Sequence, residues 1–125
     1  MMNARRRSLG MMTMVVSMTV SLGAAWADSV LFTISISHPN VVDVEFYSQS
    51  YDRVWPGNGN VWTIKEYEPH SFDLECETGE QICYGAWLRG DTDTYWGVGL
   101  NNFDGCERCC AVCGAGDATP MTLGN

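Results

Sequence analysis

The chain has 125 residues with 15 acidic and 7 basic side chains, which gives a net charge of −8 at pH 7. Without residues 1–27, which have the features of an export signal, 98 residues remain, with four basic against fifteen acidic side chains and a net charge of −11. Because nucleic acids and anionic membranes bind clustered lysines and arginines, this composition argues against both as partners.

Residues 1–27 have the pattern of a secretory signal peptide. Three arginines at 5–7 precede an apolar stretch over 11–23, and Ala25-Trp26-Ala27 is a small-x-small cleavage site. We expect a mature protein that begins at Asp28, forms a single β domain over 28–125 and is periplasmic or secreted. The apolar stretch is shorter than the roughly 20 residues that span a bilayer, so no membrane span is expected after signal removal. The arginines leave open whether export is general or twin-arginine.

Period-two alternation, which is typical of a strand with one buried face, begins at residue 30. Apolar side chains alternate with mostly polar ones over 30–36, and β-branched and aromatic side chains alternate with acidic ones over 42–47. A turn at 38–40 separates these two predicted strands. The cluster Pro56-Gly57-Asn58-Gly59-Asn60 then predicts a long loop within 52–60.

Strand patterns resume at 61–64 and 72–76, continue over 82–88 and 95–100, and end with an expected edge strand at 120–123. Residues 82–88 are apolar on both faces, which predicts a strand in the centre of a sheet or under an extra layer. Gly97 and Gly99 are expected to allow a close backbone approach or a bulge. About seven short strands predict an all-β fold, a small disulfide-stapled β-sandwich or alternatively a small barrel, with a Cys-rich C-terminal loop or short helix.

All six cysteines follow the predicted signal, and thiols outside the cytosol oxidise when they can pair. We therefore expect a disulfide framework made of Cys76, Cys83, Cys106, Cys109, Cys110 and Cys113. Cys76 and Cys83 would stand opposite each other if Gly79-Glu80 is a two-residue hairpin turn, so a bond between them is favoured. The alternative, in which one or both bond to the later cluster, stays open.

Four of these cysteines lie in eight residues, from Cys106 to Cys113, with the spacing i, i+3, i+4 and i+7. On a helix they would share one face, and four thiolates could bind zinc or copper(I). The run differs from the usual zinc and iron–sulfur spacings, and a reactive C-x-x-C needs more positive charge nearby than Arg108 supplies. Structural disulfides are therefore favoured over a metal site and over a redox pair, and no cofactor is expected.

The sequence contains no recognisable catalytic constellation. Its two histidines, His38 and His70, each adjoin a proline, and nucleophile-elbow, zinc-protease and Walker motifs are absent. Acidic and amide side chains at 91–93 and 101–105 could coordinate calcium, but neither segment fits the twelve-residue loop with its closing glutamate, so solvated acidic loops are favoured. We expect that the protein is not an enzyme.

Two tryptophans are candidate contact residues. Trp55 adjoins the glycine-rich loop, and Trp87 has the opposite parity to the apolar residues of its predicted strand. Exposed aromatics on a rigid β scaffold serve contacts with protein or carbohydrate. The competing interpretation, in which they belong to a second packed layer or to the wall beside a disulfide, is favoured.

Several segments resemble those of a family of small exported bacterial β proteins that contain cysteines. The resemblance rests on 82–87, on 95–99 and on the cysteines between 106 and 113, and also on 38–42, 46–49 and 54–57. It covers nearly all of residues 30–125. Some relatives are accessory to caspase-like domains, which implies a binding role, and the resemblance brings no catalytic residues.

These features predict a non-catalytic exported binding or interaction module whose partner is an unknown protein or carbohydrate. The alternative is a periplasmic protein that binds zinc or copper through Cys106, Cys109, Cys110 and Cys113.

Overall fold

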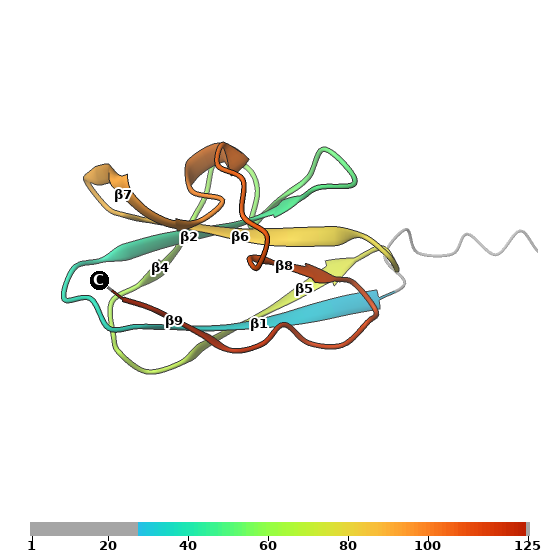
Figure 1. Ribbon diagram of the computed structural model, residues 1–125, viewed down its shortest axis with the longest axis horizontal. Helices are drawn as coiled ribbons and strands as arrows, with labels where there is room; N and C mark the ends of the chain where they lie inside the picture. Colours follow the sequence, from blue (N-terminus) through green and yellow to red (C-terminus); the bar gives the residue numbers. More distant parts are fainter. Residues whose placement is uncertain (1–27, 125) are drawn as a thin grey trace, which may run out of the picture.

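The computed structural model describes residues 28–124, so the predicted signal at 1–27 lies outside the described residues. The described chain forms two β-sheets that pack face to face (Figure 1), which confirms the predicted all-β sandwich; neither sheet closes into the alternative barrel. No helix in residues 28–124 is long and apolar enough to span a bilayer.

The smaller sheet has the order β5 (His70–Cys76), β1 (Asp28–Ile36), β9 (Met121–Leu123). The larger sheet has the order β3 (Val54–Trp55), β2 (Val42–Ser48), β6 (Gln81–Leu88), β7 (Asp91–Gly97), and it also contains β4 (Trp62–Ile64) and β8 (Cys110–Val112). Strand β1 runs antiparallel to β5 and parallel to β9, whereas all pairs of the larger sheet are antiparallel. A 3-10 turn, η1 (Leu100–Asn102), follows β7.

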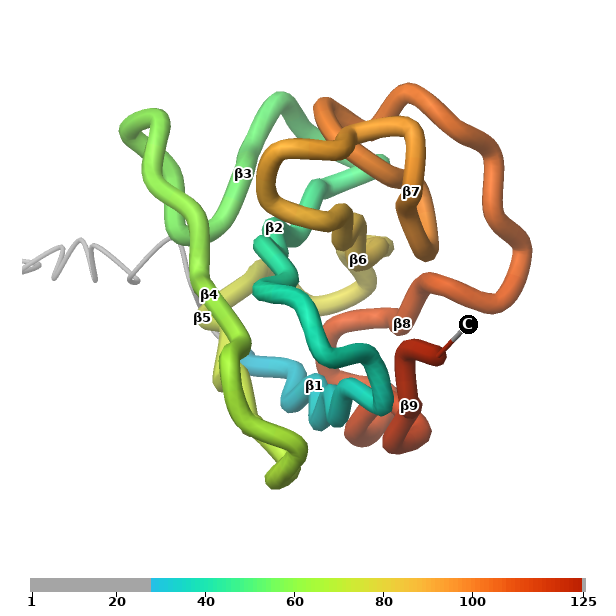
Figure 2. The backbone as a smooth tube through the Cα atoms, turned by 90° about the vertical axis from the view of Figure 1, so that its left-hand side faces the viewer, coloured from blue at the N-terminus to red at the C-terminus, as the bar shows by residue number. Residues whose placement is uncertain are grey.

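Both outer strands of the larger sheet are interrupted. Strands β3 and β4 pair with the two halves of one edge of β2. Strands β7 and β8 pair with the two halves of the edge of β6 that faces away from β2. The chain leaves the sheet between the members of each pair, at 56–61 and at 98–109. Figure 2 shows these two excursions on opposite sides of the molecule, the green one at the left and the orange one at the right. The larger sheet therefore positions two loops on its margins.

The core between the sheets follows from the alternation seen in the sequence. Phe32 of β1 and Phe46 of β2 meet with ring centres 4.7 Å apart, and the Phe46 ring also contacts Trp62 and Phe72. Such tilted and edge-on aromatic pairs stabilise a core beyond the burial of their area. The even-numbered residues of β1 from Val30 to Ile36 are all buried, as a half-buried strand requires.

Strand β6 is buried on both faces, and it is both central in its sheet and covered by an extra layer. Its even-numbered residues face the main core. On the outer face, Cys83 forms a second small cluster with Tyr47 and Val98. The segment that follows β7 lies on this outer side, away from β1 and β9 (Figure 1). Both conditions that a doubly apolar strand predicts are therefore met.

The favoured Cys76–Cys83 bond is wrong, and the alternative with the later cluster is correct. The bonds are Cys76–Cys113, Cys83–Cys110 and Cys106–Cys109. The turn after Cys76 does not join two strands of one sheet, because β5 belongs to the smaller sheet and β6 to the larger one. Cys83 instead faces Cys110 across the β6–β8 ladder.

The short-helix alternative for the Cys-rich segment is also wrong, since residues 110–112 form strand β8. The reason is a set of backbone hydrogen bonds to β6 and its preceding turn. The Tyr84 N–H donates to the Cys109 carbonyl at 2.9 Å, and the Cys113 N–H donates to the Glu80 carbonyl at 2.8 Å. Pairing with the edge of β6 therefore makes this segment a strand, although the spacing of its cysteines is also compatible with a helix.

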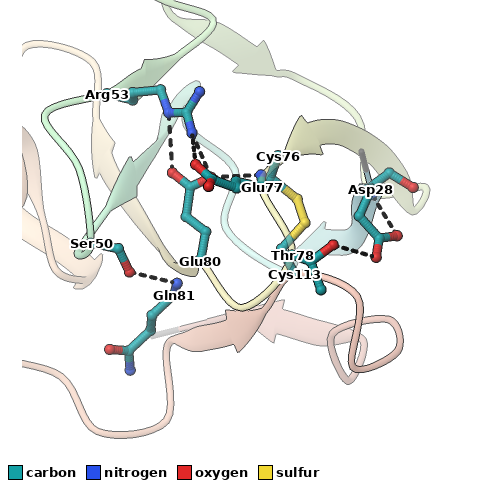
Figure 3. The surroundings of a disulfide bond; sticks show 10 residues. Asp28, Ser50, Arg53, Cys76, Glu77, Thr78, Glu80, Gln81 and Cys113 are labelled. Atoms are coloured by element: carbon teal, nitrogen blue, oxygen red, sulfur yellow. Dashed lines mark hydrogen bonds and ion pairs between the residues drawn. A yellow bond between two sulfur atoms is a disulfide. The ribbon is translucent and has the colours of Figure 1, made fainter. Parts of the chain in front are cut away.

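A buried ion pair lies beside the Cys76–Cys113 bond (Figure 3). The Glu80 side chain has no exposed surface, and its carboxylate accepts two hydrogen bonds from the Arg53 guanidinium, at 3.2 and 3.0 Å. The Glu77 N–H donates a third, at 3.0 Å. Because the Glu80 carboxylate accepts these three hydrogen bonds, it can be buried, and the pair joins the residue before β3 to the turn between β5 and β6.

Candidate binding surface

The six cysteines are all in disulfides, so the described residues contain no free thiol. Zinc and copper(I) bind thiolates, and a sulfur in a disulfide is not a thiolate. Within residues 28–124 no three side chains of the ligating types lie together in a way that could hold a metal ion. The pairing therefore gives the zinc or copper alternative no support.

The two tryptophans proposed as contact residues have different environments. Trp87 in β6 is only 5% exposed, so it packs within the protein and offers no surface to a partner. Trp55 in β3 is partly buried, packs against the main core, and has the Arg53 guanidinium 5.9 Å from its ring centre. Trp55 keeps some exposed area beside the 56–61 excursion, and its role in binding stays a prediction.

Residues 98–109, which we call the 98–109 loop, fold back over the outer face of the larger sheet. At its start the Val98 N–H donates to the Tyr84 carbonyl at 3.0 Å, and the Asp104 N–H donates to the Val98 carbonyl at 3.0 Å. At its end the Cys106–Cys109 bond closes a short ring, and Cys110 is bonded to β6. The loop is therefore held at both ends.

The middle of the loop is held by side chains of β2 and of the residue after it. The Tyr47 hydroxyl accepts a hydrogen bond from the Asn101 N–H at 2.9 Å. The Gln49 and Asn102 side-chain amides donate to each other at 2.9 and 3.3 Å. Asn101 and Asn102 both have left-handed backbone, with φ of 59° and 55°, a conformation that asparagine adopts more readily than most residues.

A glycine in β6 lets the loop lie close to the sheet. A Cβ at Gly85 would collide with the carbonyl oxygen of Gly99 and come within 2.8 Å of the Tyr47 ring. Gly97 is similarly placed against the Tyr84 carbonyl and has a φ of +64°. The prediction of a close backbone approach at the glycine-rich end of β7 is therefore confirmed, and Gly85 is its counterpart on the neighbouring strand.

The tip of this loop exposes Phe103, which is 88% accessible to solvent. Burial of a phenylalanine side chain contributes about 1.5–3 kcal/mol, which Phe103 forgoes in the free protein. Phe103 lines two recesses, each of about 260 Å³. Gln49, Gln81 and residues of the loop line one, and Thr92, Asp93, Tyr95 and Leu100 line the other. The exposed aromatic therefore borders both recesses.

The sequence did not indicate Phe103, nor Tyr95, which lines one of the two recesses. The available signal was an aromatic residue between Asn101-Asn102 and Asp104-Gly105, in a segment otherwise made of turn-forming residues. This aromatic follows the end of the predicted strand at 95–100, so strand alternation provides no core position for it. That signal is weaker than a tryptophan beside a glycine-rich loop, which made Trp55 the stronger candidate in the sequence.

Comparisons with known proteins add no relative to this picture. No protein-family model, no curated protein and no solved structure matches the chain. The family resemblance seen in the sequence therefore stays a prediction.

Proposed function

We propose that this protein is a non-catalytic binding module that acts in the periplasm or outside the cell and contacts its partner through the 98–109 loop. The observation that carries the proposal is Phe103, an almost fully exposed aromatic on a loop held by two disulfides and several hydrogen bonds. Interface hot spots are enriched in aromatic residues, and a loop ordered before binding loses little conformational entropy on association.

Three disulfides in the described chain agree with an oxidising compartment, which the export pattern of residues 1–27 also indicates. The family resemblance, which implies a role accessory to caspase-like domains, is also compatible with a binding module. These points support the proposal independently of the loop geometry.

The test is site-specific photo-crosslinking in the organism that produces the protein. A benzophenone amino acid replaces Phe103 in one variant and Tyr67 in a control variant, since Tyr67 is also an exposed aromatic, at 64%, but lies between β4 and β5. We expect a discrete cross-linked protein or glycan with the label at 103 and none at 67. Equal labelling at both positions, or none at 103, contradicts the proposal.

A further inference from the structure

One of the two recesses beside Phe103 combines aromatic and acidic side chains. It is lined by Thr92, Asp93, Tyr95, Leu100, Phe103 and Asp104, and its volume is about 260 Å³. Tyr95 is 44% exposed and Phe103 is 88% exposed, so both aromatic side chains are accessible to a ligand. Strand β7 supplies Asp93 and Tyr95, and the 98–109 loop supplies Asp104 and Phe103.

The two carboxylates of this recess have no basic partner within residues 28–124. The ion pairs there join Arg53 to Glu77 and Glu80, Arg89 to Asp43, and His70 to Glu66. The negative charge of the neighbouring Asp104 raises the pKa of Tyr95. A carboxylate has about four lone-pair positions, so Asp104 can accept hydrogen bonds from a ligand.

Resting on the proposed function, we infer that this recess binds the cationic head of an arginine or lysine side chain of a partner protein. A guanidinium or ammonium group is attracted by aromatic rings and pairs with carboxylates, and the recess offers both kinds of group at one place. A neutral apolar ligand would leave Asp93 and Asp104 desolvated without compensation, which disfavours it.

The surroundings favour a side chain on a polypeptide over a small free cation. A third recess, of about 330 Å³, shares Asp93 and Tyr95 with the recess lined by Asp104, and it extends to His38 and Trp96. This continuous surface provides contacts for the residues on either side of a bound arginine or lysine. The net charge of −11 over residues 28–125 adds long-range attraction for a basic partner.

The test is an NMR titration of the ¹⁵N-labelled protein, residues 28–125, with three small probes. The first is acetyl-Gly-Arg-Gly-amide, the second is the same peptide with citrulline, which keeps the shape and removes the charge, and the third is putrescine. We expect the arginine peptide to shift the amide signals of 92–104 and to bind at least about tenfold more tightly than the citrulline peptide.

Variants locate the effect on the recess. Asp93→Asn and Asp104→Asn should each weaken binding of the arginine peptide about two- to fivefold, whereas Asp73→Asn, an exposed aspartate on β5, should leave it unchanged. Because Asp93 is exposed, we expect Asp93→Asn to change binding of the peptide without changing the stability of the fold.

Three results would overturn the inference. Equal binding of the arginine and citrulline peptides means that the surface binds without recognising charge, which contradicts the cation assignment but leaves the proposed function intact. Tighter binding of putrescine than of the arginine peptide means that the recess takes a free cation. No shift at 92–104 with any probe removes the inference, while the cross-linking at position 103 still decides the proposed function separately.

Discussion

The Tyr47 hydroxyl accepts a hydrogen bond from the Asn101 N–H, with 2.9 Å between the two atoms. This bond connects β2, at the centre of the larger sheet, with the middle of the 98–109 loop. The nearby Glu45 carboxylate, whose own pKa is raised by burial, interacts electrostatically with the same hydroxyl. Burial, and then the negative charge of Glu45, hold the pKa of Tyr47 well above its ordinary value.

This shift predicts a loss of stability at alkaline pH. A tyrosine whose pKa is higher in the folded than in the unfolded protein contributes stability that is complete below the unfolded value, near 10, and is lost as pH rises beyond it. Urea unfolding at pH 8, 10 and 11 should show a falling free energy of unfolding, and Tyr47→Phe should reduce the decline. Tyr67→Phe is the control. An identical alkaline decline in Tyr47→Phe and in the parent protein would count against the link.

The close approach of the loop to the sheet predicts that Gly85→Ala displaces the loop. Its Cβ would collide with the Gly99 carbonyl, so we expect a loss of about 1–3 kcal/mol in the free energy of unfolding and faster hydrogen exchange at Asn101. Gly105→Ala is the matched control in the loop itself, because nothing lies within 4 Å of a Cβ at Gly105. Equal losses of stability in Gly85→Ala and Gly105→Ala would contradict close packing of the loop on β6.

The buried pair predicts that Arg53→Ala is strongly destabilising. Without Arg53 the fully buried Glu80 carboxylate keeps only the Glu77 N–H among its three hydrogen bonds, and loss of one partner of a buried pair costs about 3–5 kcal/mol. Arg89→Ala removes the ion-pair partner of Asp43, but the Arg89 guanidinium is more exposed than that of Arg53. This substitution should therefore destabilise the protein less. The double variant Arg53→Ala/Glu80→Gln should recover part of the loss, and chemical denaturation measures all four proteins.

The disulfide pattern predicts the mass and the relative effects of removing bonds. The oxidised protein should be about 6 Da lighter than the reduced one, since each of the three bonds removes two hydrogens. Replacing Cys76 and Cys113 by alanine should cost about 2–5 kcal/mol, and replacing Cys106 and Cys109 should cost less, because they are separated by 3 residues in place of 37. Four free thiols with a bound zinc or copper ion would instead favour the metal alternative.

Alternation in the sequence was sufficient for the strands whose two faces differ in exposure, such as β1 and β5. It was insufficient for β3 and β8, because two or three residues carry no periodicity and pair only where a neighbouring edge is free. The Cys76–Cys83 error has a related cause. Alternation shows that two segments are strands and does not show whether they belong to one sheet.

The sequence did not indicate Phe103. It offered Trp55 and Trp87 as candidate contact residues, with packing as the favoured interpretation of both. Exposure of a side chain depends on where the backbone runs after a strand ends, and the path from Gly97 to Cys106 is determined by contacts with Tyr47 and Gly85 that are distant in the sequence. Trp87 is buried in the structure, with 5% of its surface exposed.

We propose that Phe103 binds the partner and contributes little to the stability of the fold. The most direct measurement is the affinity of Phe103→Ala, by calorimetric titration, for the partner identified by cross-linking, beside its thermal unfolding midpoint. We predict that binding weakens by about 1–4 kcal/mol, the range of interface hot spots, while the midpoint stays within a few degrees of the parent protein. Unchanged affinity, or a large fall in the unfolding midpoint, would show that Phe103 is not the contact residue of a preformed binding loop.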